Sequence, residues 1–211
     1  MAFAEPVTLE GHHVRLDPMA SERADALAAA LGTAAADGRM WESKVTTIPR
    51  PDEMRAYVDQ ALAELEAGVS LPFVTVDRTS GRVVGSTRYM NIEASHRRLE
   101  IGTTWIGKSF QRTAINTEAK YLMLQHAFET LHCIAVDLRT HEKNAQSRAA
   151  IERLGATLDG ILRNHRIQPD GSLRNTASYS IIDSEWPEVK VRLETRLSQG
   201  SMPRARPPAS A

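Results

Sequence analysis

The sequence predicts one α/β domain, in which a central mixed, mostly antiparallel sheet carries helices on both faces. Short strands with alternating apolar residues follow one another through tight turns, which is typical of antiparallel pairing. A long amphipathic helix then separates two further strands, and such a crossover makes those two strands parallel. The 211 residues contain no internal repeat and no linker, so we expect a single domain over residues 1–198.

The first third of the chain predicts a β-hairpin followed by two helices. The hairpin turns at Glu10-Gly11, and Pro18 ends its second strand because proline cannot continue a central ladder. Ser21 is the expected N-cap of the first helix, and Gly68 suits the C-terminal end of the second. These four elements are expected at residues 7–9, 13–16, 21–36 and 51–67.

The rest of the chain predicts an antiparallel meander, a crossover, a second hairpin and a last helix. The helix over residues 113–131 places the strand after it parallel to the strand before it. Asn144 caps the next helix, which ends at Gly155, and Ser184 begins the last one. The strands are expected at residues 71–77, 82–89, 97–106, 134–139, 157–167 and 176–182.

Composition excludes some classes of partner. Acidic and basic residues number 26 each, so the chain has no overall field that would attract nucleic acid or an anionic membrane. No run reaches the length of a membrane span, and the single cysteine, Cys133, fits a reducing cytoplasm. Residues 199–211 are rich in Pro, Ser and Arg, and we expect a disordered tail. A local basic patch, or else ordinary solvated surface, is expected from Arg97, Arg98, Arg163 and Arg166.

The most informative stretch is residues 101–130, where an apolar strand enters a polar turn that opens into the long helix. A helix N-terminus offers unpaired N–H groups and a partial positive charge, which together suit a phosphate. Small or polar residues in the turn, including Thr113 and Ala114, allow the backbone to approach a ligand. An ordinary turn without a ligand is the alternative. The turn lacks glycine and the GxxxxGK[ST] pattern, which argues against a P-loop.

A second junction of this kind begins at Asn144-Ala145-Gln146-Ser147. Because the two junctions follow neighbouring parallel strands, they are expected at the same edge of the sheet, with a cofactor between them. A simple N-cap is the alternative explanation of Asn144.

Several segments together resemble the GCN5-related N-acetyltransferases, in particular the branch of the ribosomal-protein alanine acetyltransferases. The resemblance covers roughly residues 6–198. Its most specific parts are RRLEIGTTWIGKSFQRTAINTEAKYLMLQHAFE and VDLRTHEKNAQSRAAIERLGATLDGILRNH, supported by TLEGHHVRLDPM, VVGSTRYMNI and SYSIIDSEWPEVK.

The resemblance implies that acetyl-CoA binds where the parallel strands 97–106 and 134–139 splay apart in a V. The family holds the pyrophosphate on a Q/R-x-x-G-x-G/A loop, from which this chain departs at Ala114 and Asn116. No metal is implied. A homodimer is expected for a different reason, because the antiparallel edges of such a sheet invite pairing with a second copy. The implied cofactor-binding residues are Thr104, Trp105, Ile106, Gln111, Arg112, Thr113, Ala114, Ile115, Asn116, Thr117, Asn144 and Ser147.

The resemblance also implies direct transfer of acetyl to an amine, which needs a base for the amine and an acid for the thiolate. Glu100 is the candidate base, unless it is simply ion-paired. Ser147 and Tyr179 share the candidate acid role, although a strand tyrosine is more often part of the core. That neither residue is the acid is the third alternative. The other candidate bases are His141 and His165, for which ordinary polar surface is the alternative. The candidate acceptor-pocket residues are Trp41 and Tyr89, for which core packing is the alternative.

Three functions therefore compete. The first is an acetyl-CoA-dependent N-acetyltransferase acting on a primary amine of a protein N-terminus or a small molecule. The second is a non-catalytic acyl-CoA sensor that regulates a partner. The third is a nucleotide-binding domain, which is disfavoured because no phosphate-reading lysine accompanies the turn.

Overall fold

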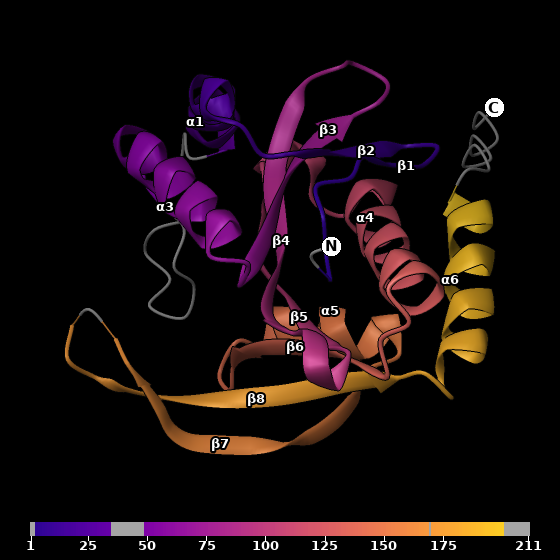
Figure 1. Ribbon diagram of the computed structural model, residues 1–211. Coiled ribbons are helices and arrows are strands. Elements are labelled where there is room, and N and C mark those ends of the chain that lie inside the picture. The colour runs from indigo at the N-terminus through magenta and orange to yellow at the C-terminus, as the bar shows by residue number, and fades with distance from the viewer. Residues whose placement is uncertain (1–2, 35–48, 169, 201–211) are drawn as a thin grey trace, which may run out of the picture.

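The computed structural model describes residues 3–34, 49–168 and 170–200. In this part of the chain the strands form one eight-stranded sheet in the order β1-β2-β3-β4-β5-β6-β8-β7, and neighbours are antiparallel except for β5 and β6 (Figure 1). The strands are β1 (Leu9–Glu10), β2 (Val14–Pro18), β3 (Ser70–Asp77), β4 (Val83–Glu93), β5 (Arg98–Ile106), β6 (Ala135–His141), β7 (Thr157–Ile167) and β8 (Leu173–Ile182).

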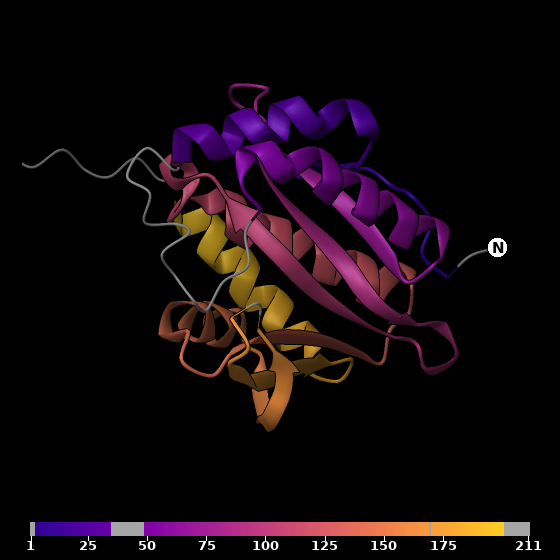
Figure 2. The ribbon, with the colours of Figure 1, turned by 90° about the vertical axis from the view of Figure 1, so that its left-hand side faces the viewer.

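Helices cover both faces of the sheet, as predicted. Figure 2 shows α1 and α3 side by side along one face, with α4 and α6 behind the sheet. One apolar core lies under α1 and α3, and a larger one lies between the sheet and the helices of the opposite face. The helices are α1 (Ala24–Ala34), α3 (Met54–Glu66), α4 (Ala114–Gln125), α5 (Ala145–Leu154) and α6 (Trp186–Gly200).

The order of these elements is the predicted one, but some element ends differ. Ser21 is not an N-cap, because the chain first makes a 3₁₀ turn over Ser21–Arg23 whose cap is Ala20. The long helix changes to a π-helical turn over His126–Thr130, so that Leu131 bonds five residues back. The last helix begins at Trp186 rather than Ser184 and continues through Gly200, two residues beyond the predicted end of the domain.

The junction of β5 and β6 positions the site. Only three residue pairs join these strands, from Arg98 with Ala135 to Glu100 with Asp137, and beyond them the strands separate. In Figure 1 the two halves of the sheet accordingly run in different directions, with β4 upright and β8 crossing below it. Beyond the splay, β5 also bulges against β4, where Thr103 has a φ of 48°. A positive φ is strained for a β-branched residue, and such strain concentrates at functional sites.

Candidate active site at the splay between β5 and β6

Glu100 lies at the apex of the splay, in the last residue pair that joins β5 to β6. Its side chain is buried, with the residue 5% exposed. Asn91 Nδ2 donates a hydrogen bond to Glu100 Oε2 at 2.8 Å, and Arg139 lies 3.3 Å from the same oxygen. Burial raises the pKa of the Glu100 carboxyl, against the opposing effects of Arg139 and Asn91. Glu100 is thus both ion-paired and, by its raised pKa, a stronger base than an exposed glutamate.

The N-terminus of α4 lies at the open end of β5. Thr113 caps the helix, since its Oγ1 accepts a hydrogen bond from the backbone N–H of Ile115 at 3.4 Å. Gln111 Nε2 donates to the carbonyl of Ile106 at 3.0 Å, which ties the turn to the end of the strand. The first-turn N–H groups of a helix have no acceptor within the helix. This turn therefore offers backbone donors at the predicted phosphate position.

Two polar residues at this end of the fold, Arg112 and Asn116, lie in or next to the first turn of α4, where the ligand phosphate is expected. Arg112 is exposed and has a φ of 61°, which gives the turn its shape without glycine. Asn116 Oδ1 is buried and has no hydrogen-bond partner in the described part of the chain. A buried carbonyl of this kind is costly unless a ligand or water donates to it.

The predicted cofactor residues on β5 and α4 differ in whether their side chains are exposed or packed in the core. Thr104 is exposed, whereas Trp105 is packed into the core under α1 and α3. Ile106 and Ile115 belong to the opposite core. The apolar members of the set can therefore contact a ligand mainly through their backbone.

The N-terminus of α5 opens at the same edge of the sheet, because α5 follows β6 as α4 follows β5. Asn144 Oδ1 accepts a hydrogen bond from the backbone N–H of Ser147 at 3.0 Å, so Asn144 is the predicted N-cap. The hydroxyl of Ser147 is on a half-buried residue and makes no hydrogen bond within residues 3–34, 49–168 and 170–200. It is available for a ligand.

The two tyrosines of the predicted site are fully buried. The hydroxyl of Tyr179 accepts a hydrogen bond from Arg148 Nε at 2.9 Å and donates one to Glu152 Oε1 at 2.8 Å. Burial raises the pKa of Tyr179. Tyr89 donates to the carbonyl of Met123 at 2.6 Å and packs in the core rather than at a pocket wall. Trp41 lies outside the described residues.

Lys120 is a group that sequence reasoning missed. It lies on α4 and is only 6% exposed. Its Nζ donates to Thr104 Oγ1 at 2.6 Å and to Thr87 Oγ1 at 3.0 Å, and burial lowers its pKa to about 7. It lies one helical turn after Asn116, on the same face of the helix. This i, i+4 spacing of two polar residues beside an apolar stripe was the available signal.

The two candidate histidines differ in their surroundings. His141 Nδ1 accepts a hydrogen bond from the backbone N–H of Lys143 at 3.0 Å, so it shapes the turn before α5. Burial is the main cause that lowers the pKa of both His141 and His165. His165 Nδ1 is buried without a hydrogen-bond partner in the described part of the chain. Neither histidine thus has the contacts of an established base.

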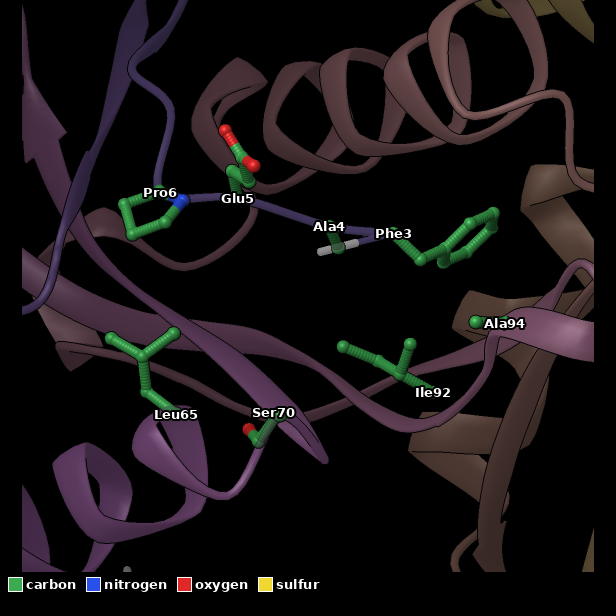
Figure 3. A pocket seen from close by; sticks show the side chains of 9 residues that line it. Phe3, Ala4, Glu5, Pro6, Leu65, Ser70, Ile92 and Ala94 are labelled. Carbon is green, nitrogen blue, oxygen red and sulfur yellow. The ribbon is translucent and has the colours of Figure 1, made fainter. Parts of the chain in front are cut away.

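A separate apolar hollow of about 450 Å³ lies at the closed end of the β5–β6 pair. Figure 3 shows Phe3, Leu65 and Ile92 around it. Because Ile92 and Ala94 lie near the β4–β5 turn, this hollow lies away from the helix N-termini at the other end of β5.

Within the described residues, no group of His, Cys, Asp and Glu side chains is arranged to hold a metal ion. None of the described helices combines the length and the hydropathy that crossing a membrane requires.

Comparison with known proteins gives consistent matches. The family model for the acetyltransferase (GNAT) domain matches residues 13–157. The chain is 31% identical to the "Putative ribosomal N-acetyltransferase YdaF" of Bacillus subtilis over 136 residues, which is 64% of this chain and 68% of that protein.

Solved structures match over most of the fold. A GCN5-related N-acetyltransferase from Brucella melitensis has a TM-score of 0.84 and 31% identity, covering 95% of this chain and 90% of that one. Mycobacterium smegmatis RimJ, solved in complex with CoA-disulfide, has a TM-score of 0.74 over 90% of this chain and 95% of that one. At 23% identity, the RimJ match concerns the fold alone.

Proposed function

This chain belongs to the GNAT acetyltransferase family and is an acyl-CoA-dependent N-acetyltransferase, and on that premise we propose that it transfers acetyl from acetyl-CoA directly to a primary amine. The acceptor is a protein N-terminus or a small molecule. The name of the Bacillus subtilis relative supports a ribosomal protein as one acceptor to test.

The observation that carries this proposal is the position of Glu100 at the apex of the splay. The two helix N-termini that suit a phosphate-bearing cofactor open on the same edge, so the pyrophosphate is expected on Gln111–Asn116 and the acetyl group near the apex. A buried carboxylate there can take the proton of the attacking amine, directly or through one water. Arg139 and Asn91 hold the carboxylate in place.

For protonation of the departing thiolate we favour Ser147 over Tyr179. Ser147 stands in the first turn of α5 and its hydroxyl is available to a ligand. The hydroxyl of Tyr179 is fully buried between Arg148 and Glu152, and it must leave those partners to reach a sulfur atom.

The test is release of CoA thiol with a panel of primary amines, including peptides with free N-termini. Glu100→Gln is expected to lower kcat by about 10²-fold or more, since general-base catalysis contributes about that factor. The KM for acetyl-CoA should change little. Tight binding of acetyl-CoA without turnover of any amine would instead identify an acyl-CoA sensor.

The expected homodimer and cytoplasmic location stay predictions. Exposed apolar side chains on the β7–β8 hairpin, chiefly Ile167 and Leu173, support self-association. Sedimentation of the full chain tests the first prediction, and fractionation of cells tests the second.

A further inference from the structure

The face of the sheet that carries Glu100 also carries a group of arginines. Side chains alternate between faces along a strand, and Leu99 and Ile101 enter the core beside α4, so Glu100 points to the opposite face. Arg139 reaches Glu100 and also donates to Ser178 Oγ at 3.4 Å, which places the same face of β8 next to them.

Two further arginines follow on this face, toward the tip of the β7–β8 hairpin. Arg174 lies four residues before Ser178 on β8 and therefore shares its face. Arg166 of β7 is paired directly with Arg174. Directly opposed side chains of an antiparallel pair are close neighbours, and like charges there are destabilising. Burial and the charge of Arg166 both lower the pKa of Arg174. Such a pair is favourable when an anion lies between its members.

The hairpin also holds hydrogen-bonding groups that the described part of the chain leaves without partners. Three buried atoms have no hydrogen-bond partner there: Arg174 Nε, His165 Nδ1 and Thr176 Oγ1. Buried polar groups in native proteins are nearly always satisfied, and each unmet one is costly. Guanidinium and hydroxyl groups can both donate hydrogen bonds to the oxygens of one carboxylate or phosphate.

The carboxylates of this face do not balance its arginines. Arg98 is 2.8 Å and Arg139 is 3.1 Å from Asp137, and Arg139 also pairs with Glu100. In the described residues, Arg166 and Arg174 have no carboxylate within ion-pair distance. The charge of Arg166 is still felt at Glu100, where it helps to hold down the pKa of the carboxyl. The unbalanced positive charge therefore borders the proposed base.

From this arrangement we infer that Arg166 and Arg174, with Thr176, form an anion subsite beside Glu100. The inference rests on the proposed function and names the substrate class of the same site. The acceptor is a primary amine that carries a carboxylate or phosphate a few bonds from its nitrogen. A neutral amine leaves the arginines unpaired, and a polycationic amine is repelled by them.

The test compares amines that differ only in the anion. O-phosphoethanolamine against ethanolamine examines a phosphate, and β-alanine against β-alaninamide examines a small carboxylate. Tetrapeptide amides beginning Ser-Asp and Ser-Asn examine a peptide carboxylate. The anionic member of at least one pair is expected to have a kcat/KM about tenfold higher or more, because unpaired buried donors reject the neutral analogue. The arm with the largest ratio identifies the source of the anion.

Variants show whether the arginines carry the preference. Arg166→Gln and Arg174→Gln should each reduce the ratio of kcat/KM for the anionic amine to kcat/KM for the neutral amine about tenfold, without changing the KM for acetyl-CoA. Arg174→Lys keeps the charge and should retain part of the preference. Arg153→Gln is the matched control, because Arg153 is exposed on α5.

Three results would overturn the inference. Equal kcat/KM within every pair, while the enzyme acetylates amines, contradicts the anion subsite but leaves the proposed function intact. A preference that persists in both glutamine variants places the anion elsewhere. Absence of turnover with every amine overturns the proposed function as well.

Discussion

At the residue scale, Lys120 is the most unusual group near the proposed cofactor site. A buried ammonium normally has a carboxylate partner. The described part of the chain gives Lys120 only the hydroxyls of Thr87 and Thr104, and Thr104 lies on the bulged segment of β5. The lysine therefore ties α4 to the strand that is expected to bind the pantetheine arm, at the cost of burying its own charge.

A pH-dependent stability follows from Lys120. Its pKa falls from 10.5 in the unfolded chain to about 7 in the folded protein, so between these values the unfolded state binds the additional proton. Burying the charged lysine lowers the free energy of unfolding by its full amount below pH 7, and this loss of stability decreases as the pH rises toward 10.5. The free energy of unfolding of Lys120→Met, relative to the parent, should thus be greater at pH 6.5 than at pH 9, by about 2 kcal/mol.

Urea unfolding of both proteins at the two pH values measures this difference. Lys108→Met, a change at an exposed lysine, corrects for general effects of pH. A pH-independent difference between Lys120→Met and the parent would show that Lys120 stays charged in the folded protein.

Variants of Ser147 and Tyr179 test which of the two residues protonates the departing thiolate. Ser147→Ala should lower kcat about tenfold or more, with little change in the KM for acetyl-CoA, if its hydroxyl protonates the thiolate. Tyr179→Phe should instead lower stability by about 1–3 kcal/mol, since it leaves Arg148 and Glu152 without their shared partner. Steady-state kinetics and urea unfolding of the two variants distinguish the roles. A stable, inactive Tyr179→Phe protein would reverse the assignment.

Sequence reasoning located these candidate residues through backbone signals rather than side-chain contacts. Asn144 was identifiable because N-caps have a local signature, and the structure confirms it as a cap. Thr113, which was expected only as a polar residue of the turn, is a cap as well. Lys120 and the Arg166–Arg174 pair were not identified as such, because burial and cross-strand register depend on distant parts of the chain. A lysine or arginine in a sequence is expected at the surface.

At the element scale, the first hairpin is held by a helix far along the chain. Glu118 of α4 is buried, and its carboxylate accepts hydrogen bonds from the backbone N–H groups of His12, His13 and Val14, at 2.9, 2.6 and 2.8 Å. A Cβ on Gly11 would lie 2.5 Å from Glu118 Cδ, so the turn needs glycine for this contact. One side chain thus fixes β1 and β2 against α4.

Glu118→Gln should lower the free energy of unfolding by about 2–3 kcal/mol, because an amide cannot accept all three bonds of the carboxylate. Glu188→Gln, on the exposed side of α6, is the control. Gly11→Ala should destabilise the protein independently of any charge effect. Urea midpoints equal to that of the parent in both Glu118→Gln and Gly11→Ala would show that Glu118 does not hold the first hairpin against α4.

The order of strands and helices could be predicted because it depends on the period of the apolar residues and on the Gly, Pro and capping residues between segments. The apolar stripe expected from Ile115, Ala119, Leu122 and Met123 predicted which face of α4 is buried. Ile115, Ala119 and Met123 are in the core, and Leu122 is partly buried against it. The ends of elements were predicted less well. The 3₁₀ turn at Ser21 and the π-helical turn after Gln125 have no distinctive residue pattern, because tertiary packing decides between such closely related turns.

At the scale of the whole molecule, the parallel pair is the narrow point of the sheet. Three residue pairs join β5 to β6, whereas seven join β6 to β8. A ligand that fills the splay adds contacts to both strands and to the N-termini of α4 and α5, where the sheet itself provides none. Cofactor binding is therefore expected to stabilise the junction more than any other part of the fold.

Because the junction is narrow, binding of the cofactor there should produce a measurable gain in stability. At a concentration of about 100 times its Kd, acetyl-CoA should stabilise the folded protein by about 2.7 kcal/mol, which is roughly 5–10 °C in Tm for a chain of this size. Amide hydrogen exchange should slow at residues 101–106, 111–117 and 138–141. ATP should give no comparable shift, and a shift equal to that of acetyl-CoA would favour a nucleotide-binding domain.

Ala114→Pro removes one backbone N–H from the first turn of α4, where proline is tolerated, and should weaken the stabilisation by acetyl-CoA. If the variant folds and binds as tightly as the parent, the pyrophosphate does not lie on this turn.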